Sequence, residues 1–342
     1  MKYPSRRIHR PRTQRGFVLV LTLWVMAIAA IAAAYFSEKV SSAVEMAEKS
    51  RQNAHAHIDL DSSRAEILYR LATTSLNVEG LGRGNALIRL DDRRYRASGR
   101  TLVQLQDSRG LFNLNQSPDD RLQRFLGLLG VTPEQRSHLV DTLADYTDAD
   151  KLERINGAEE PQYRARGLPP PTNNALSTPM EVRRIIGWRD MPQITQNRRF
   201  LDLTSTASVM GLNPNTAPVE VLATLPGMTD VIARILIGQR EQIPILHQGQ
   251  LSALTGIPES MLEMQIFVTP GNTLRIRQSA IGVQWGLQYS VTLTPNGNNG
   301  PWRIDYMSQI SMPAQAPDDA TPPLPLRSTA VPESPPALGY GG

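Results

Sequence analysis

The sequence predicts an α+β protein: a long N-terminal helix, then an antiparallel sheet that is interrupted by a large helical block. Residues 17–74 contain no Gly and no Pro, so nothing in them breaks a helix. Alternating apolar residues typical of strands occupy two distant stretches, 86–107 and 273–310. Between these stretches, residues 117–264 have helical spacing with capping residues before the apolar runs.

The composition excludes several kinds of site. The 342 residues include no Cys, which rules out disulfides, thiol catalysis and cysteine-ligated metals. The pI of about 9.5 comes largely from residues 1–15, which hold six basic residues and no acidic one. A nucleic-acid-binding protein should instead carry its basic residues on the folded domain. The chain has no HExxH, GxSxG or Walker sequence, so we expect no enzyme.

An uncharged apolar segment follows this basic leader. It runs from Phe17 to Phe36, and as a helix of about 30 Å it would cross one bilayer. The cations before it and Glu38 after it predict that residues 1–16 are cytoplasmic and that the remainder lies across the membrane. The helical pattern continues over residues 37–78, which we expect to form a stem beyond the membrane.

The junction between leader and apolar segment has two interpretations. A prepilin-type peptidase would cut after Gly16 and leave Phe17 as the first residue. A signal peptidase would cut beyond the apolar segment, where Ala32-Ala33-Ala34 offers a small-residue site. A span that continues directly into a charged, amphipathic stem favours the first interpretation.

The helical block repeats one kind of turn. Leu225-Pro-Gly227 and the similar Leu254-Thr-Gly256 match the helix-hairpin-helix pattern. In that pattern the glycine permits the positive φ of the turn, and the leucines clamp two helices together.

Hairpins of this kind often bind DNA backbones. Residues 213–241 hold Arg234 and Arg240 against three acidic residues, so this copy is slightly acidic. Such a surface is a poor partner for phosphates. We therefore expect a structural or protein-contact role and no nucleic acid, although a membrane-tethered DNA-binding protein of competence type stays the alternative.

Carboxylates crowd residues 143–163. The candidate metal ligands are Asp145, Asp148, Asp150 and Glu159, with Glu160 as a spare. Hard oxygen donors on a loop suit Ca²⁺, which accepts irregular geometry. The spacing does not match an EF-hand. From the residues alone, a calcium site and a solvated, helix-capping acidic loop remain equally open.

Taken together, these motifs resemble the K family of type II secretion minor pseudopilins. The resemblance covers residues 14 to about 310. It rests on the motifs Gly16-Phe17, Leu21 where pilins carry Glu, Asp107-x-x-Gly110-x-Phe-Asn-Leu-Asn, Asp145-Tyr-x-Asp-x-Asp with Gly157-Ala-Glu-x-x-Tyr, and Asn213-x-Asn-Thr-Ala-Pro-x-Glu-Val-Leu. It implies a pseudopilin sheet formed by residues 79–115 and 266–311, with a helical domain inserted over 116–265.

The resemblance also implies a structural function. The prepilin peptidase would cut after Gly16 and methylate Phe17. The protein would remain in the inner membrane with its C-terminal domain in the periplasm. It would join the I and J minor pseudopilins above the major pseudopilin, and Leu21 would mark the tip, where no subunit lies above to need a carboxylate. The resemblance further favours calcium at the acidic loop. Residues 312–342 are rich in Pro, and we expect this tail to be disordered.

Overall fold

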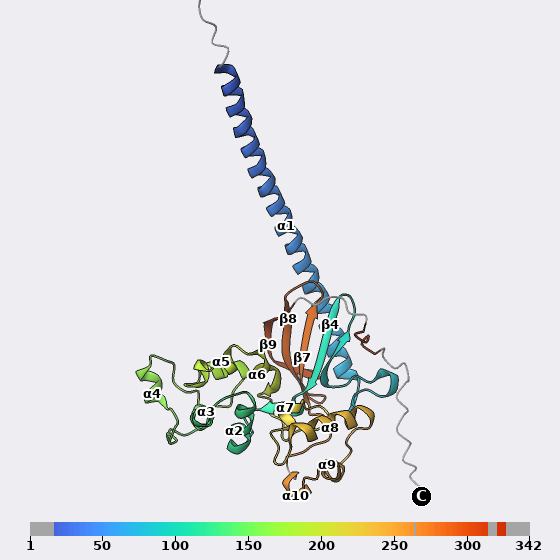
Figure 1. Cartoon of the computed structure of the whole chain (residues 1–342). Helices are drawn as coiled ribbons and strands as arrows, with labels where there is room; N and C mark the ends of the chain where they lie inside the picture. The colour runs from blue at the N-terminus through green and yellow to red at the C-terminus, as the bar shows by residue number, and fades with distance from the viewer. Residues whose placement is uncertain (1–16, 263–264, 314–319, 326–342) are drawn as a thin grey trace, which may run out of the picture. The chain divides into compact units, whose positions relative to one another are not determined.

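The computed structural model describes residues 17–262, 265–313 and 320–325 (Figure 1). The chain divides into two units, residues 1–57 and 58–342. In the first unit, helix α1 (Phe17–Thr73) begins at Phe17, and its residues 18–55 are all exposed. A helix that is apolar on all sides must be covered by something other than water. By length and composition, α1 can cross a membrane.

Helix α1 ends at Thr73, so our expectation of a stem reaching residue 78 is wrong. A small hairpin of β1 (Leu76–Asn77) and β2 (Gly80–Leu81) follows. The Asn77 side chain stabilises this hairpin, because its Oδ1 accepts from the Glu79 N–H and its Nδ2 donates to the Gly82 carbonyl. These bonds favour a turn over a further helical turn.

The second unit contains a five-stranded antiparallel sheet with the order β3-β4-β7-β8-β9. The strands are β3 (Asp91–Arg96), β4 (Thr101–Asp107), β7 (Thr273–Ala280), β8 (Trp285–Leu293) and β9 (Trp302–Ser311). Strands β4 and β7 pair along their whole length, from Thr101 opposite Ala280 to Asp107 opposite Leu274. The two parts of the sheet predicted from distant stretches of sequence are therefore neighbours, and the predicted fold class is confirmed.

One predicted strand is absent from the described part of the sheet. Ala86 is the last residue of a short 3₁₀ turn, η1 (Gly84–Ala86). Among residues 87–90 only Ile88 forms a bridge, to Leu81. Ile88 and Leu90 are buried in the core. The alternation that suggested a strand therefore reflects burial of these two side chains without a hydrogen-bonded ladder.

The two faces of the sheet contact different layers. Along β7, Leu274 and Ile276 lie in a core with Ile67 and Leu71 of α1. Because side chains alternate along a strand, Arg275 and Arg277 point to the opposite face, and both make contacts with the helical block.

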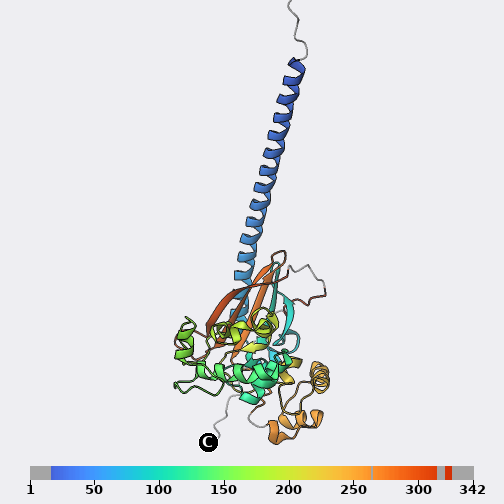
Figure 2. The same ribbon diagram turned by 60° about the vertical axis from the view of Figure 1, so that its left-hand side comes forward.

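The helices gather at one end of the sheet, which both views show (Figures 1 and 2). The block comprises α2 (Asp119–Leu128), α3 (Pro133–Thr147), α4 (Glu160–Ala165), α5 (Pro192–Thr195), α6 (Arg198–Leu203), α7 (Val219–Leu222), α8 (Asp230–Gln242), α9 (Gln248–Thr255) and α10 (Glu259–Leu262), with the 3₁₀ turns η3 (Pro179–Arg184) and η4 (Trp188–Asp190). Turn η2 (Ser108–Gly110) and the two-residue parallel pair of β5 (Phe112–Asn113) with β6 (Thr204–Ser205) lead into it. Its mainly aliphatic core includes aromatic contacts: Phe112 stacks on Phe125 at 4.1 Å, and the buried Trp188 meets Phe200 edge-on.

Part of the C-terminal tail is ordered, so the expectation of disorder over 312–342 is wrong for this part. Met312 is buried and donates its N–H to the Gln284 carbonyl. Residues 320–325 lie against β3, where Pro323 forms a parallel bridge with Arg96. An extended Pro-rich segment needs only a few backbone bonds and one apolar anchor to stay in place, and Leu324 is that anchor.

Candidate functional site

The buried carboxylate of Asp107 accepts hydrogen bonds from both ends of the inserted helical block and from its middle. Asp107 ends β4 and is fully buried. Its Oδ2 accepts from Asn213 Nδ2 at 2.8 Å and from Thr216 Oγ1 at 3.0 Å. Its Oδ1 accepts from the N–H groups of Arg109 and Gly271, both at 3.0 Å. Burial raises the pKa of Asp107, and these four bonds oppose the rise.

This junction explains two of the sequence motifs. Gly110 must lack a side chain, since a Cβ there would lie 2.6 Å from Thr216 Oγ1 and 2.8 Å from the Thr216 carbonyl carbon. The Asn213–Pro218 segment supplies two of the four donors to Asp107 and ends directly before α7. Two of the motifs that carried the resemblance therefore meet at the point where the sheet joins the helical block.

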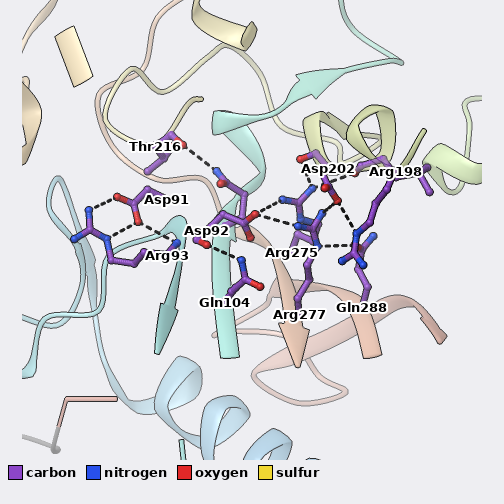
Figure 3. A network of polar contacts seen from close by, with 12 residues as sticks. Asp91, Asp92, Arg93, Gln104, Arg198, Asp202, Thr216, Arg275, Arg277 and Gln288 are labelled. Atoms are coloured by element: carbon purple, nitrogen blue, oxygen red, sulfur yellow. Dashed lines mark hydrogen bonds and ion pairs between the residues drawn. The ribbon is translucent and has the colours of Figure 1, made fainter. Parts of the chain in front are cut away.

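A second polar cluster lies on the sheet face turned to the helical block (Figure 3). The buried Arg275 and Arg277 of β7 both pair with Asp92, at 3.3 and 3.0 Å. Arg277 also pairs with Asp202 of α6 at 2.5 Å. Burial lowers the pKa of Arg275 to about 10, and the nearby Arg277 adds to this effect. The cluster connects β3 and α6 to β7. The pattern Arg275-x-Arg277 within an apolar strand could have predicted this cluster, and we missed it.

The acidic loop is organised by Asp145 of α3. This side chain is fully buried, and its Oδ2 accepts from the Ala158 N–H at 2.8 Å and from the Arg154 N–H at 3.2 Å. The loop passes so close that a Cβ on Gly157 would lie 1.8 Å from Asp145 Oδ2. Gly157 and Ala158 are thus needed for the loop to close over the carboxylate.

Two further candidate ligands carry oxygens without partners. Asp148 Oδ1 and Glu159 Oε1 are buried and accept no hydrogen bond. Burial raises the pKa of Asp145, of Asp148 and of Glu159. Repulsion from Asp150 and Asp145 raises the pKa of Asp148 further, and repulsion from Asp145 and Asp148 does the same for Glu159. Buried carboxylate oxygens without donors are costly unless something neutralises them.

The remaining acidic candidates are more exposed. Asp150 is exposed, and its Oδ1 accepts from the Leu152 N–H. Glu160 pairs with Arg164 at the surface. Across the described residues, no three His, Asp or Glu side chains converge closely enough to hold a metal by themselves. The donor set still fits Ca²⁺, which completes its shell with backbone carbonyls and waters.

The predicted hairpin turns are present with one difference. Gly227 and Gly256 adopt positive φ of 74° and 72°. Leu225 is buried, as a clamping residue should be, whereas Leu254 is 38% exposed. Leu251 and Ile257 are the buried residues of this second turn. The expectation that Leu254 clamps the helices is therefore wrong, because α9 turns Leu251 inward instead.

The first hairpin offers few cations to a phosphate. Arg240 of α8 is buried and donates to the carbonyls of Pro214 and Ala217, at 2.6 and 2.7 Å. Thr229, at the usual position of a second glycine, is the N-cap of α8 and accepts from the Ile232 N–H. Arg234 is exposed, but Asp230 and Glu241 of the same helix are exposed too.

The N-terminal candidates are only partly described. Gly16 lies outside the described residues, and Phe17 is the first residue of α1. Leu21, four residues further on, is 53% exposed on this helix.

Comparisons with known proteins agree with this geometry. A family model described as "Type II secretion system (T2SS), protein K" matches residues 100–219. A relative in Escherichia coli strain K12, named for the same family, is 30% identical over an alignment of 261 positions that covers 66% of this chain and 75% of that protein. The chain belongs to the type II secretion system protein K family.

Two further members of the protein K family match at lower identity. The protein K of Klebsiella pneumoniae is 26% identical over 66% of this chain and 75% of its own length. The protein K of Pseudomonas aeruginosa is 28% identical, over 65% and 72%. The region that matches the protein K model includes Asp107, the acidic loop and Asn213.

A solved structure shares the protein K fold. The match is to a chain in the crystal structure of the GspK-GspI-GspJ complex from the enterotoxigenic Escherichia coli type 2 secretion system. It has a TM-score of 0.56 at 17% identity and covers 77% of this chain and 99% of that one. Members of the protein K family are structural components of a secretion system.

Proposed function

We propose that this protein is the minor pseudopilin at the tip of the type II secretion pseudopilus. It is anchored by α1 in the inner membrane, with the leader in the cytoplasm and the residues after Phe36 in the periplasm. After cleavage behind Gly16 and methylation of Phe17 by the prepilin peptidase, it joins the I and J minor pseudopilins. There it helps to start the pseudopilus that exports folded proteins.

The observation that carries this proposal is the position of the helical block. It is inserted between β4 and β7 without disturbing their pairing, so a pseudopilin core keeps its sheet while carrying an additional domain at one end. A domain of this size at the end of the sheet would obstruct a subunit stacked above this protein. This favours the last position of a filament for the protein. Leu21 supports the same position, since it removes the buried carboxylate that stacked subunits share.

Co-purification from membranes tests the proposed position. The full chain, carrying a C-terminal affinity tag, is expressed with the I, J and major pseudopilins of the same organism. We expect the tag to recover I and J together, with little major pseudopilin. Recovery of the major pseudopilin in large excess would place the protein along the shaft and contradict the proposal.

The competence-type alternative is supported less well. The buried Arg240 and the exposed Asp230 and Glu241 leave the hairpin without a cationic surface. DNA binding through phosphates would weaken steeply as salt rises. Measurable, salt-dependent binding of duplex DNA by the full chain at physiological salt would favour this alternative.

We further propose that the acidic loop binds calcium. Asp145, Asp148 and Glu159 would supply carboxylate oxygens, and Asp150 could reach the same ion from the loop surface. The support is the pair of buried, unpartnered oxygens on Asp148 and Glu159. The ion would have a structural role, because it neutralises the carboxylates that hold the loop against α3.

A further inference from the structure

Strand β3 forms one edge of the five-stranded sheet, and the ordered part of the tail covers it. We name residues 320–325 the tail strap. The Arg96 N–H donates to the Pro322 carbonyl at 2.8 Å, and the Leu324 N–H donates to the Arg96 carbonyl at 2.7 Å. The strap thus joins β3 through one isolated parallel bridge, between Pro323 and Arg96. At the other edge, β9 pairs with β8 alone among the described strands.

The strap is fixed to the core of the second unit as well as to β3. Leu324 is buried in the cluster that contains Ile67 and Leu71. Arg70 donates from Nη1 to the Pro325 carbonyl at 2.5 Å, and the same guanidinium pairs with Glu66 at 2.7 Å. The strap therefore spans the gap between the sheet edge and α1.

The chemistry of the strap suits it to end a sheet. Residues 322, 323 and 325 are Pro and have no N–H, so Leu324 has the single backbone donor of this stretch. That N–H already donates to the Arg96 carbonyl. A further strand would find no N–H of residues 322–325 to pair with, and Pro on an edge is a common protection against strand addition.

We propose that the tail strap is an intramolecular edge cap, which keeps β3 from pairing with β3 of a second copy of this chain. Without the strap, the Arg96 N–H and carbonyl become an open template. Two β3 edges can pair antiparallel about a two-fold axis, because such an interface is self-complementary. The cap would keep this subunit single while it waits for its partners in the membrane.

The test compares full-length protein with three variants in detergent micelles. One variant ends at Pro313 and lacks the strap. A matched control ends at Pro325, which keeps the strap and removes only residues 326–342. The third, Leu324→Asp, releases the strap without shortening the chain. All four proteins also carry Arg94→Cys, and since the natural chain has no cysteine, a disulfide reports pairing at this edge alone.

We expect full-length protein and the control ending at Pro325 to be monomers without a disulfide. At high protein concentration the other two variants should double in mass by light scattering and form the intermolecular disulfide on oxidation. Diluted under reducing conditions until they are monomers, they should lose hydrogen-exchange protection at the Arg96 amide. Tryptophan fluorescence, to which the buried Trp188 contributes beside Trp24, Trp285 and Trp302, reports whether each variant is folded. Folded variants that lose protection at Arg96 yet remain monomers at high protein concentration would overturn the proposal. So would an Arg96 amide that stays protected in the diluted monomers of these variants.

Discussion

The carboxylate of Asp107 accepts a hydrogen bond from the side-chain amide of Asn213 at 2.8 Å, inside a fully buried junction. Asp107 is the last residue of β4, and Asn213 lies deep within the insertion. The Gly271 N–H, on the chain returning to β7, donates to the same carboxylate. One side chain thus fixes where the inserted domain leaves the sheet, where it returns and how its middle is held.

Removing this carboxylate should destabilise the second unit. Asp107→Ala removes the shared acceptor of four hydrogen bonds at a buried junction, and we expect a loss of about 3 kcal/mol in the free energy of unfolding. Thermal unfolding of the full chain in detergent, followed by Trp fluorescence, measures the loss. Asp61→Asn is the matched control, because that side chain is 62% exposed, and it should change stability by less than about 0.5 kcal/mol. Equal melting temperatures for both variants would contradict the proposed junction.

Calcium should stabilise the protein in a pH-dependent way. The folded-state pKa values of Asp145, Asp148 and Glu159 are raised, so the folded chain binds protons that the unfolded chain releases. Without calcium, their contribution is most favourable below the unfolded values of about 4, and stability falls as pH rises through the raised values. Calcium binds the ionised forms and should offset this fall.

The measurement is the difference in melting temperature between calcium and chelator. It should be absent near about pH 4 and full near about pH 7, because protons compete with the ion for the carboxylates. Calcium at about 100 times its Kd would add roughly 2.7 kcal/mol. Asp148→Ala with Asp150→Ala should abolish the difference, whereas Asp120→Asn, an exposed acid on α2, should preserve it. Identical melting curves with calcium and with chelator at pH 7 would contradict calcium binding and favour a solvated, helix-capping acidic loop.

Gly157→Ala should disrupt the acidic loop from within. The added Cβ would lie 1.8 Å from Asp145 Oδ2, and this buried carboxylate could move aside only by giving up its bonds to the N–H groups of Arg154 and Ala158. We expect loss of the calcium-dependent stabilisation together with a destabilisation of about 1–3 kcal/mol. Gly130→Ala is an informative comparison, because nothing lies within 4 Å of a Cβ there although its φ is positive. That variant should be strained but keep its calcium response.

Leu21→Glu should reduce assembly. At the tip, no N-terminal amine of a subunit above neutralises the new carboxylate, which stays unpaired in hydrocarbon. Such a group costs about 2–3 kcal/mol at mid-membrane and less near the edge. The fraction of protein recovered with the I and J pseudopilins measures the effect, and Leu21→Ile serves as the apolar control. Better recovery of the Glu variant would indicate a subunit within the shaft.

Much of the fold was predictable because buried apolar residues recur at regular spacing along a helix or a strand. The segment TLRIRQSA was expected as a strand and forms β7 over Thr273–Ala280. The same logic failed at residues 86–90, where two apolar side chains enter the core from irregular backbone. The ordered strap was not predictable from a Pro-rich composition, since its place depends on Arg96 and Arg70, which are far away in sequence.

The candidate sites show a similar division. The sequence identified the acidic loop but not which of its carboxylates are buried, because that depends on the close approach of Gly157 to α3. It gave no indication that Asp107 and Asn213 share a hydrogen bond across more than a hundred residues. Leu254 was misassigned because one helical turn decides between an inward and an outward side chain, and sequence spacing does not resolve that choice.

The mature N-terminus tests the central claim most directly. The protein is purified from membranes of cells that carry the secretion system, and its intact mass and N-terminal peptide are measured by mass spectrometry. Gly16→Val, which puts a branched side chain at the cut, should leave the chain unprocessed. The account predicts a mature chain that begins with N-methylated Phe17. A mature chain that begins at Tyr35 would show that a signal peptidase removes the apolar segment, and it would contradict the assignment of this protein as a pseudopilin.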